Sequence, residues 1–223
     1  MKITVVNGQS HKGSTYHIGK MLADKLGGKV TEFFLPKDFS DMCIGCTSCF
    51  IKNEHLCPHH ARLEKLTNAI FTSPVYVYHT TGAMKSFLDH YGYRWMVHRP
   101  EKKMFSKQAV CISTAAGAGT KSTNKDIADS FFFWGIPKIY KYGLNVRATS
   151  YNGISENTLK AIDKKTTALA KKIKAKDGKV KVGIKTKAFF ELMRIIQRKS
   201  DWNEADTDYW HNKGWDGKKR PWK

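Results

Sequence analysis

Five short apolar runs alternate with longer segments of helical periodicity, and this alternation limits the fold more than any other feature of the sequence. Strands are expected at residues 3–6, 30–35, 69–72, 109–113 and 138–144, and helices at 15–26, 60–66, 83–90, 124–134 and 155–173. Most of the strand runs are continuously apolar, as in strands covered on both faces. The series predicts an α/β fold, a doubly wound five-stranded parallel sheet with right-handed crossovers and helices on both faces.

The chain after about residue 175 has a different composition. Residues 160–223 hold 19 Lys and Arg against 8 Asp and Glu, a net charge of +11. A basic linker over 174–187 precedes an amphipathic helix at 188–199 and an irregular tail that contains Trp202, Trp210, Trp215 and Trp222. We therefore divide the chain into a domain over 1–175 and a basic, Trp-rich C-terminal extension over 176–223. The apolar surface of the extension is large enough that we expect it to be docked, not disordered.

The formal net charge of the whole chain is +20. A charge of this size informs about binding partners and not about the fold. It is compatible with a nucleic acid, an anionic cofactor, an acidic electron-transfer protein, an anionic membrane surface or a simply solvated surface. No apolar leader precedes the first strand and no 18 apolar residues run together, so neither a signal peptide nor a membrane span is expected. These features favour a cytoplasmic protein, in which thiols stay reduced.

Four of the five cysteines, Cys43, Cys46, Cys49 and Cys57, fall within fifteen residues. The three-residue spacing of the first three, and the proline that follows the fourth, are typical of ligands to a [4Fe–4S] cluster. A tetrahedral zinc site and free thiols lining a redox pocket are the alternatives. Because this segment follows the second strand, we expect the four thiols beside the carboxyl edge of the sheet. Cys111 lies inside the fourth strand and is expected to be a core residue.

The loop after the first strand, Asn7 to Thr15, places glycines, hydroxyls and a lysine before a helix. Free backbone N–H groups and the positive helix end favour a phosphate there. Ser14 and Thr15 stand where a Walker A loop needs Lys and Ser or Thr, and Gly8 is followed by Gln-Ser and not by the G-x-G-x-x-G pattern. An ATPase and a dinucleotide-binding Rossmann domain are both disfavoured.

The loops after the third and fourth strands, 72–85 and 113–120, combine aromatic residues with small ones. Such loops suit a flat heteroaromatic ring, with apolar surface on its faces and backbone N–H groups near its polar edge. In an open α/β sheet, ligands lie beyond the carboxyl ends of the strands, where these loops meet.

Taken together, the loop 8–15, the Ser-Pro-Val-Tyr turn at 73–76, the helix at 82–89 and the turn at 115–119 resemble the flavodoxin-like NAD(P)H-dependent FMN reductases, and more narrowly the iron–sulfur flavoproteins. The resemblance covers about residues 1–150. It implies that the FMN phosphate is held by Ser10, Lys12, Gly13, Ser14 and Thr15. It assigns the isoalloxazine ring to Pro74, Val75, Tyr76, Val77 and Tyr78 and to Thr114, Ala115, Ala116, Gly117, Ala118 and Gly119. Seven residues separate Cys49 from Cys57, at the long end of the spacing in cluster-binding members.

The resemblance implies an FMN-dependent oxidoreductase, with NAD(P)H as the co-substrate and a quinone, a small aromatic molecule or a protein as the acceptor. No catalytic acid or base stands out in the sequence. One alternative is an electron-transfer module fed by ferredoxin through a cluster. Another is a redox-sensing protein that binds nucleic acid, which we regard as the less favoured reading. Members of the family are commonly oligomers, so we expect Trp202, Tyr209 or Trp210 to pack across a homo-oligomer interface, with packing on the same subunit as the alternative.

Overall fold

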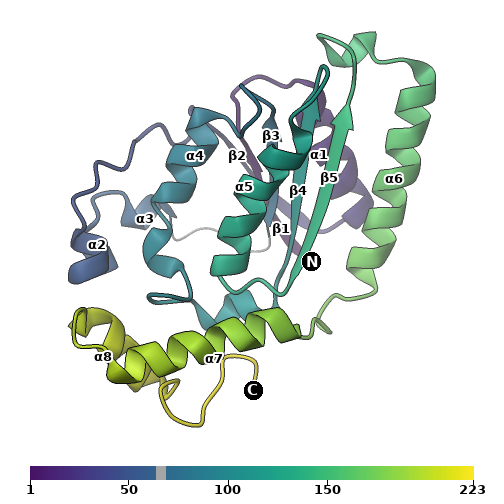
Figure 1. Ribbon diagram of the computed structural model, residues 1–223. Coiled ribbons are helices and arrows are strands. Elements are labelled where there is room, and N and C mark those ends of the chain that lie inside the picture. The colour runs from purple at the N-terminus through teal and green to yellow at the C-terminus, as the bar shows by residue number, and fades with distance from the viewer. Residues whose placement is uncertain (64–68) are drawn as a thin grey trace.

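A five-stranded, fully parallel sheet with helices on both faces forms the body of the protein (Figure 1). The computed structural model describes residues 1–63 and 69–223. Its strands are β1 (Lys2–Asn7), β2 (Lys29–Phe34), β3 (Ala69–Pro74), β4 (Gln108–Ala115) and β5 (Lys138–Asn145). Its helices are α1 (Ser14–Leu26), α2 (Ser48–Ile51), α3 (His60–Leu63), α4 (Gly82–Asp89), α5 (Thr120–Phe133), α6 (Glu156–Lys174), α7 (Ile184–Lys199) and α8 (Glu204–Lys213).

The strands lie in the order β2-β1-β3-β4-β5, which is the flavodoxin order. The predicted fold class and all five predicted strands are confirmed, with ends that differ by one or two residues. The order reverses between β1 and β3, because the chain winds outward from β1 in both directions. Ligands of doubly wound sheets bind at this switch point.

Alternation along the strands divides the core between the two faces of the sheet. Phe71 packs with α4 and α5, whereas its neighbour Ile70 packs with α1 and α6. Val110 and Cys111 alternate in the same way on β4, and Cys111 is fully buried, as expected. This period of two follows from the pleat of a strand. The edge strand β2 departs from the pattern, because its first four residues are exposed on a sheet edge that no further strand covers.

The C-terminal extension folds against the amino end of the sheet, below the strands in Figure 1. A third apolar cluster joins it to the body, with Phe105 and Met96 on one side and Phe190, Trp210 and Trp215 on the other. The ring of Phe190 lies 4.7 Å from that of Trp210 and 5.6 Å from that of Phe105. The extension is therefore docked, as its apolar content predicted.

One expectation about the extension was wrong, and another is narrowed. The tail is not irregular, because α8 forms over Glu204–Lys213. Trp210 and Tyr209 pack on their own subunit: the Trp210 Nε1–H donates to the His98 carbonyl at 2.6 Å, and the Tyr209 hydroxyl donates to the Pro100 carbonyl at 2.8 Å. Trp202 differs, since 71% of it is exposed, and its packing across a homo-oligomer interface stays a prediction.

The remaining expected helices form, apart from a difference at 60–66. There α3 occupies His60–Leu63, and the rest of that prediction falls on residues 64–68, outside the described residues. Helix α7 begins four residues earlier than expected, inside the predicted linker. No helix in residues 1–63 or 69–223 is both long enough and apolar enough to cross a bilayer.

Candidate functional site

A cavity of about 270 Å³ opens at the carboxyl edge of the sheet, over the switch point between β1 and β3. Its walls come from the segments that follow β1, β3, β4 and β5. The lining residues are Asn7, Gly8, Gln9, His11, Gly13, Ser14, Thr15, Tyr16, Thr72, Pro74, Val75, Tyr76, Thr114, Ala115, Ala116, Val146, Ala148 and Thr149. Polar residues gather at the start of α1, and apolar ones on the opposite wall.

The polar end of the pocket is the N-terminus of α1. Gly13 caps this helix without a side-chain hydrogen bond, so the first backbone N–H groups of the 13-residue helix point toward the pocket with no acceptor from the cap. A Cβ on Gly13 would lie 2.8 Å from the His11 ring, so glycine lets the imidazole fold over the turn. N–H groups, the hydroxyls of Ser14 and Thr15 and the helix dipole together make an anion site.

The floor of the pocket contains an unsatisfied donor. Asn7 is buried, and its Oδ1 accepts a 2.8 Å hydrogen bond from Thr72 Oγ1. Its Nδ2 has no hydrogen-bond partner, although a buried amide N–H without one costs about 1–3 kcal/mol. The carbonyl of Gly8 accepts from Thr81 Oγ1 at 2.7 Å, and its N–H donates to the Thr72 carbonyl at 2.7 Å. The floor is rigid, and Asn7 offers its amide to a ligand.

A strained turn projects beside the pocket. Tyr76 and His79 exchange two backbone hydrogen bonds of 3.0 Å, so Val77 and Tyr78 form the tip of a two-residue hairpin. Their φ angles are +47° and +65°, in the left-handed region that β-branched and bulky residues avoid. Asp126 on α5 holds the turn by accepting from the Thr80 N–H at 3.2 Å, with His79 Nδ1 3.0 Å from the same carboxylate oxygen.

Strain of this kind costs of order 1–3 kcal/mol per residue and is retained where function needs it. Val77 is 92% exposed, and Tyr78 is exposed too. The turn presents two large apolar side chains to solvent next to the cavity. A flat ring or an incoming substrate in the cavity would lie next to these two side chains.

The segment after β4 closes the other side. Thr114 Oγ1 lies 2.5 Å from Thr15 Oγ1, which ties this segment to the start of α1. Gly119 has a φ of +98°, and a Cβ there would come within 2.5 Å of Val75 Cγ1 and 3.0 Å of Tyr78 Cα. Glycine is therefore required for the turn after β4 to approach the hairpin after β3. Gly117 differs, because a Cβ there would meet nothing within 4 Å, and its carbonyl accepts from Asn145 Nδ2.

Nine of the sixteen residues assigned to a cofactor from the sequence lie in the pocket wall. They are Gly13, Ser14, Thr15, Pro74, Val75, Tyr76, Thr114, Ala115 and Ala116. The others lie outside the lining. Ser10 donates to the Leu35 carbonyl at 3.4 Å, and Lys12 lies over the Tyr16 ring at 5.5 Å. Val77 and Tyr78 form the hairpin tip, and Gly117, Ala118 and Gly119 form the turn before α5.

Sequence reasoning missed the lining residues that follow β5, namely Val146, Ala148 and Thr149. Their signal was available, because the carboxyl end of β5 lies at the same edge as those of the other parallel strands. It also missed Asn7, whose buried amide is recognisable only from the hydrogen bonds around it.

The residues present fit FMN. One end of the pocket provides N–H donors, two hydroxyls and a helix N-terminus for a phosphate. The other provides Val75, Ala115 and Ala116 for the faces of a flat ring, beside the exposed hairpin. The unsatisfied amide of Asn7, which also lines the pocket, supplies a donor for a polar atom of a ligand.

The four clustered cysteines lie near one another in space. The pKa of Cys49 is raised to about 11, first by burial and then by the neighbouring sulfurs of Cys57, Cys43 and Cys46. The pKa of exposed Cys46 is lowered instead, chiefly by the backbone N–H of Ser48 and then by the Ser48 hydroxyl. Cys49 is thus a protonated thiol at neutral pH unless a cation binds beside it.

The expected position of the thiols beside the pocket was wrong. Cys49 lies on α2, which packs against α8 (Figure 1), and no cysteine is among the residues that line the carboxyl-edge pocket. Buried Arg99 causes this placement, because its guanidinium donates to the carbonyls of Cys49 and Phe50 and pairs with Asp206 of α8. The cysteine segment is anchored on the C-terminal extension and not on the sheet edge.

In the described part of the chain, the only group of three potential metal ligands whose ligand atoms all lie within 4.8 Å of one another is Glu54, His55 and His60. The Glu54 carboxylate is already paired with Arg94 and Arg99, each at 3.3 Å. Tetrahedral zinc, bonded at about 2.3 Å to each sulfur, would need thiolates about 3.8 Å apart. No three of the clustered cysteine sulfurs in the described residues lie within 4.8 Å of one another, as three ligands of one zinc ion would.

Comparisons with known proteins agree with the fold. Residues 1–150 match the family model of NADPH-dependent FMN reductases. An FMN-dependent NADH-azoreductase from Bacillus anthracis str. Ames Ancestor, solved in complex with FMN, is 11% identical, with a TM-score of 0.56 over 76% of this chain and 100% of that one. A flavone reductase is 16% identical, with a TM-score of 0.54 over 80% of this chain and 64% of that one. At these identities the likeness shows the fold. A search of curated proteins gives no significant match.

Proposed function

The chain belongs to the family of NADPH-dependent FMN reductases, and we propose that its carboxyl-edge pocket is where FMN binds and where electrons pass from NAD(P)H to a small aromatic or quinone acceptor. The protein is a flavin-dependent oxidoreductase. The observation that supports this location best is the meeting of an uncapped helix N-terminus with a glycine-bearing loop and an apolar wall over the switch point of the sheet.

Bound FMN supplies the redox chemistry, because its ring system accepts a hydride and gives up electrons. The chain supplies binding and orientation. Ser14, Thr15 and the N-terminus of α1 would hold the phosphate. Backbone N–H groups of the 114–119 segment would face the polar edge of the ring and stabilise negative charge there. The hydrogen bond between Thr15 and Thr114 keeps these two sets of donors in register.

The exposed hairpin supports an aromatic acceptor. Val77 and the rings of Tyr76 and Tyr78 project beside the cavity, where they offer apolar surface to a flat molecule. Aromatic groups stack on such surface with a gain of about 0.5–1.5 kcal/mol beyond burial. A rigid, strained tip needs little ordering when a ligand arrives.

The acceptor class is tested by following NADPH and NADH oxidation by FMN-loaded protein with a quinone, an azo dye or a ferredoxin as the acceptor. We expect turnover with the small aromatic acceptors in the absence of any protein partner. Turnover with ferredoxin alone would contradict a small-molecule acceptor and favour an electron-transfer module.

We also propose that Cys43, Cys46, Cys49 and Cys57 bind a [4Fe–4S] cluster. What favours this second role is the three-residue spacing of the first three cysteines, together with the proximity of the four sulfurs, which adds to the effect of burial in raising the pKa of Cys49. Four thiols held together are costly to ionise, and a bound metal removes this cost because its positive charge stabilises the thiolates.

Iron and sulfide analysis after anaerobic reconstitution tests the cluster. The matched control is the variant with all four cysteines changed to serine, which keeps the size of the side chains. We expect iron and sulfide in the native chain and neither in the control. Equal iron in both proteins would exclude the cluster and leave the FMN proposal unchanged, because no cysteine lines the pocket.

A further inference from the structure

Helix α7 carries a row of exposed aliphatic side chains on its outer face. Ile184 is 87% exposed, Leu192 51% and Ile195 46%. The side chains that pack on the body, Thr186, Phe190, Met193 and Gln197, occupy the opposite face. The apolar row is thus additional to the packing face, and the docking of α7 on the sheet leaves it uncovered.

Cations flank this row. Lys185, Lys187, Arg198 and Lys199 are exposed on either side of it or at its end. Glu191 is the one acidic residue of α7, and it pairs with Arg194 at 2.7 Å and with Arg220. These hydrogen bonds outweigh burial and lower the pKa of Glu191, so the carboxylate is ionised but neutralised by its partners. The outer face of α7 is aliphatic and cationic.

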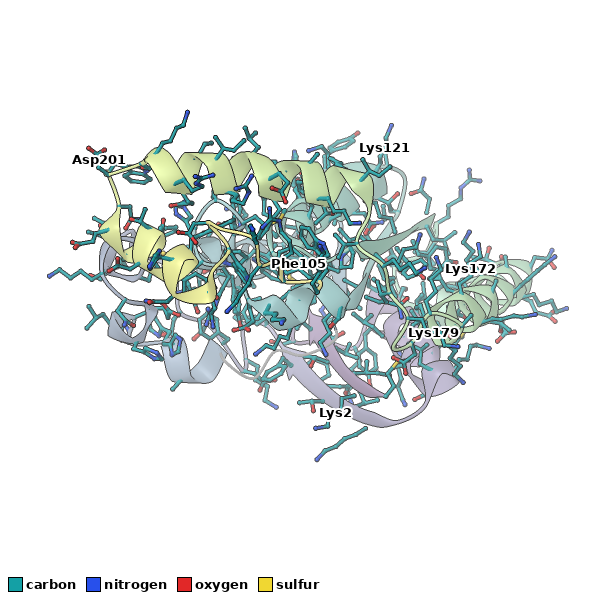
Figure 2. The ribbon with its side chains drawn as sticks, turned by 90° about the horizontal axis from the view of Figure 1, so that it is seen from below. Lys2, Phe105, Lys121, Lys172, Lys179 and Asp201 are labelled. Carbon is teal, nitrogen blue, oxygen red and sulfur yellow. The ribbon has the colours of Figure 1, made fainter. Side chains whose placement is uncertain are left out.

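The row of aliphatic side chains lies on a helix at the edge of the molecule. Helix α7 lies along one edge of the molecule seen from below, ending near Asp201, and its outer side chains project away from the body (Figure 2). Sixteen residues at 1.5 Å each make it about 24 Å long. Trp202, just beyond its end, is 71% exposed. This pattern is typical of a helix that lies in a membrane interface: one exposed face is aliphatic, lysine and arginine lie on either side of it, and a tryptophan lies at one end.

We propose that α7 docks the protein on the surface of an anionic lipid bilayer. The row of Ile184, Leu192 and Ile195 enters the boundary between headgroups and acyl chains, and the flanking cations bind lipid phosphates. A second copy of the chain fits less well, because two such helices would bring like charges together. An acidic protein would match the charge but would need its own cleft for a projecting ridge.

Docking through α7 has a consequence for the pocket. The last turn of α5 packs on α7, with the Phe132 and Phe189 rings 5.5 Å apart, whereas the first turn of α5 borders the pocket segments. Helix α5 has 14 residues, so α7 and the pocket are separated by about 21 Å along it. The pocket faces away from α7, and the docked protein would take NAD(P)H and its acceptor from the aqueous side.

The test is cosedimentation of the full-length protein with vesicles of phosphatidylcholine, with or without about 30% phosphatidylglycerol. We expect at least tenfold tighter binding to the anionic vesicles. The variant Leu192→Gln/Ile195→Gln keeps the net charge and should bind them at least tenfold more weakly. Lys187→Glu/Arg198→Glu should lose at least as much, whereas Lys164→Glu/Lys165→Glu, an equal charge change on exposed residues of α6, should change binding less than about threefold.

Two results would show that α7 does not dock on a bilayer. Equal vesicle binding by wild type and Leu192→Gln/Ile195→Gln would overturn the proposal, since adsorption would then follow net charge alone. Failure of the wild type to bind anionic vesicles would overturn it as well. NADPH oxidation with a water-soluble acceptor should be the same in all these proteins, so failure of the membrane proposal is distinguishable from failure of the proposed function.

Discussion

Thr15 at the start of α1 and Thr114 at the end of β4 lie 2.5 Å apart through their hydroxyl oxygens. They are 99 residues apart in the chain, and their bond joins the anion-binding end of the pocket to the wall that would face a flat ring. It fixes the distance between these two walls of the pocket. This hydrogen bond does not cap α1, because the N-cap residue of α1 is Gly13, which has no side chain to accept one.

The double substitution Ser14→Ala/Thr15→Ala should weaken FMN binding at least tenfold. It removes two hydroxyls from the phosphate end, and hydrogen bonds to a charged group contribute about 1.5–3 kcal/mol each. Fluorescence titration of FMN measures the affinity. Ser106→Ala/Ser200→Ala removes two hydroxyls far from the pocket and should leave it unchanged. Unaltered FMN affinity in the first variant would remove the phosphate assignment.

Alanine substitutions at two glycines of the turn after β4 should have different effects, one on stability and the other on FMN binding. Gly119→Ala places a Cβ 2.5 Å from Val75 Cγ1 at a φ of +98°, so we expect a loss of stability of about 2 kcal/mol or more. Gly117→Ala meets nothing within 4 Å and should leave stability unchanged but weaken FMN binding, because the new methyl group blocks close approach of the backbone. Urea unfolding and FMN titration measure the two effects. Equal FMN affinity in Gly117→Ala and wild type would place the ring elsewhere.

Removing the Asp206 carboxylate should destabilise the protein strongly. Asp206 is buried, pairs with Arg99, lies 2.7 Å from His98 Nδ1 and accepts from Asn203 at 2.8 Å. Asp206→Ala removes one of the two carboxylates that pair with the buried Arg99 guanidinium, the other being Glu54, and breaking a buried pair costs about 3–5 kcal/mol. Urea unfolding measures the loss. Asp208→Ala makes the same charge change on the exposed side of α8 and should cost less than about 0.5 kcal/mol. Similar costs in both variants would show that Arg99 does not join the extension to the body.

Alkylation should distinguish the cysteines by pH. The thiolate is the reactive form, so a lowered pKa moves reaction to lower pH and a raised pKa moves it to higher pH. Cys46 should react at lower pH than Cys49, because burial and the neighbouring sulfurs raise the pKa of Cys49 to about 11, whereas hydrogen bonds from Ser48 lower the pKa of Cys46. Mass spectrometry after iodoacetamide treatment of the metal-free protein between about pH 7 and pH 10 gives the order. Reaction of Cys49 at the same pH as Cys46 would show that the four sulfurs do not influence one another.

The parts of the fold that follow from local patterns were predictable. Continuous apolar runs gave the five strands, and their alternation with helical segments gave a parallel sheet whose carboxyl edge carries the pocket. The place of Ser14, Thr15 and the 114–116 segment in the pocket wall was predictable because their position relative to strand ends is visible in the sequence. Helix α8 was missed because Glu204–Lys213 is polar almost throughout and depends on contacts of Asp206 and Trp210 with residues about a hundred positions away.

The cysteine segment shows the same limit. It leaves the sheet near the pocket, as its position after β2 predicted, but its path is decided by Arg99, which binds two carbonyls of the segment and one carboxylate of the extension. No spacing rule contains such a long-range contact. Val77 is a further case, because only the two hydrogen bonds between Tyr76 and His79 place a β-branched residue at a positive φ.

Anaerobic reconstitution with FMN, followed by addition of NADPH or NADH and then of a quinone, tests the central claim most directly. We expect the purified protein to retain the flavin on gel filtration, the flavin absorbance to bleach when NAD(P)H is added, and the colour to return with the acceptor. The Ser14→Ala/Thr15→Ala variant should lose the flavin on the same column. Protein that retains no FMN, or bound FMN that neither NADPH nor NADH reduces, would contradict the assignment of the carboxyl-edge pocket as a flavin-dependent active site.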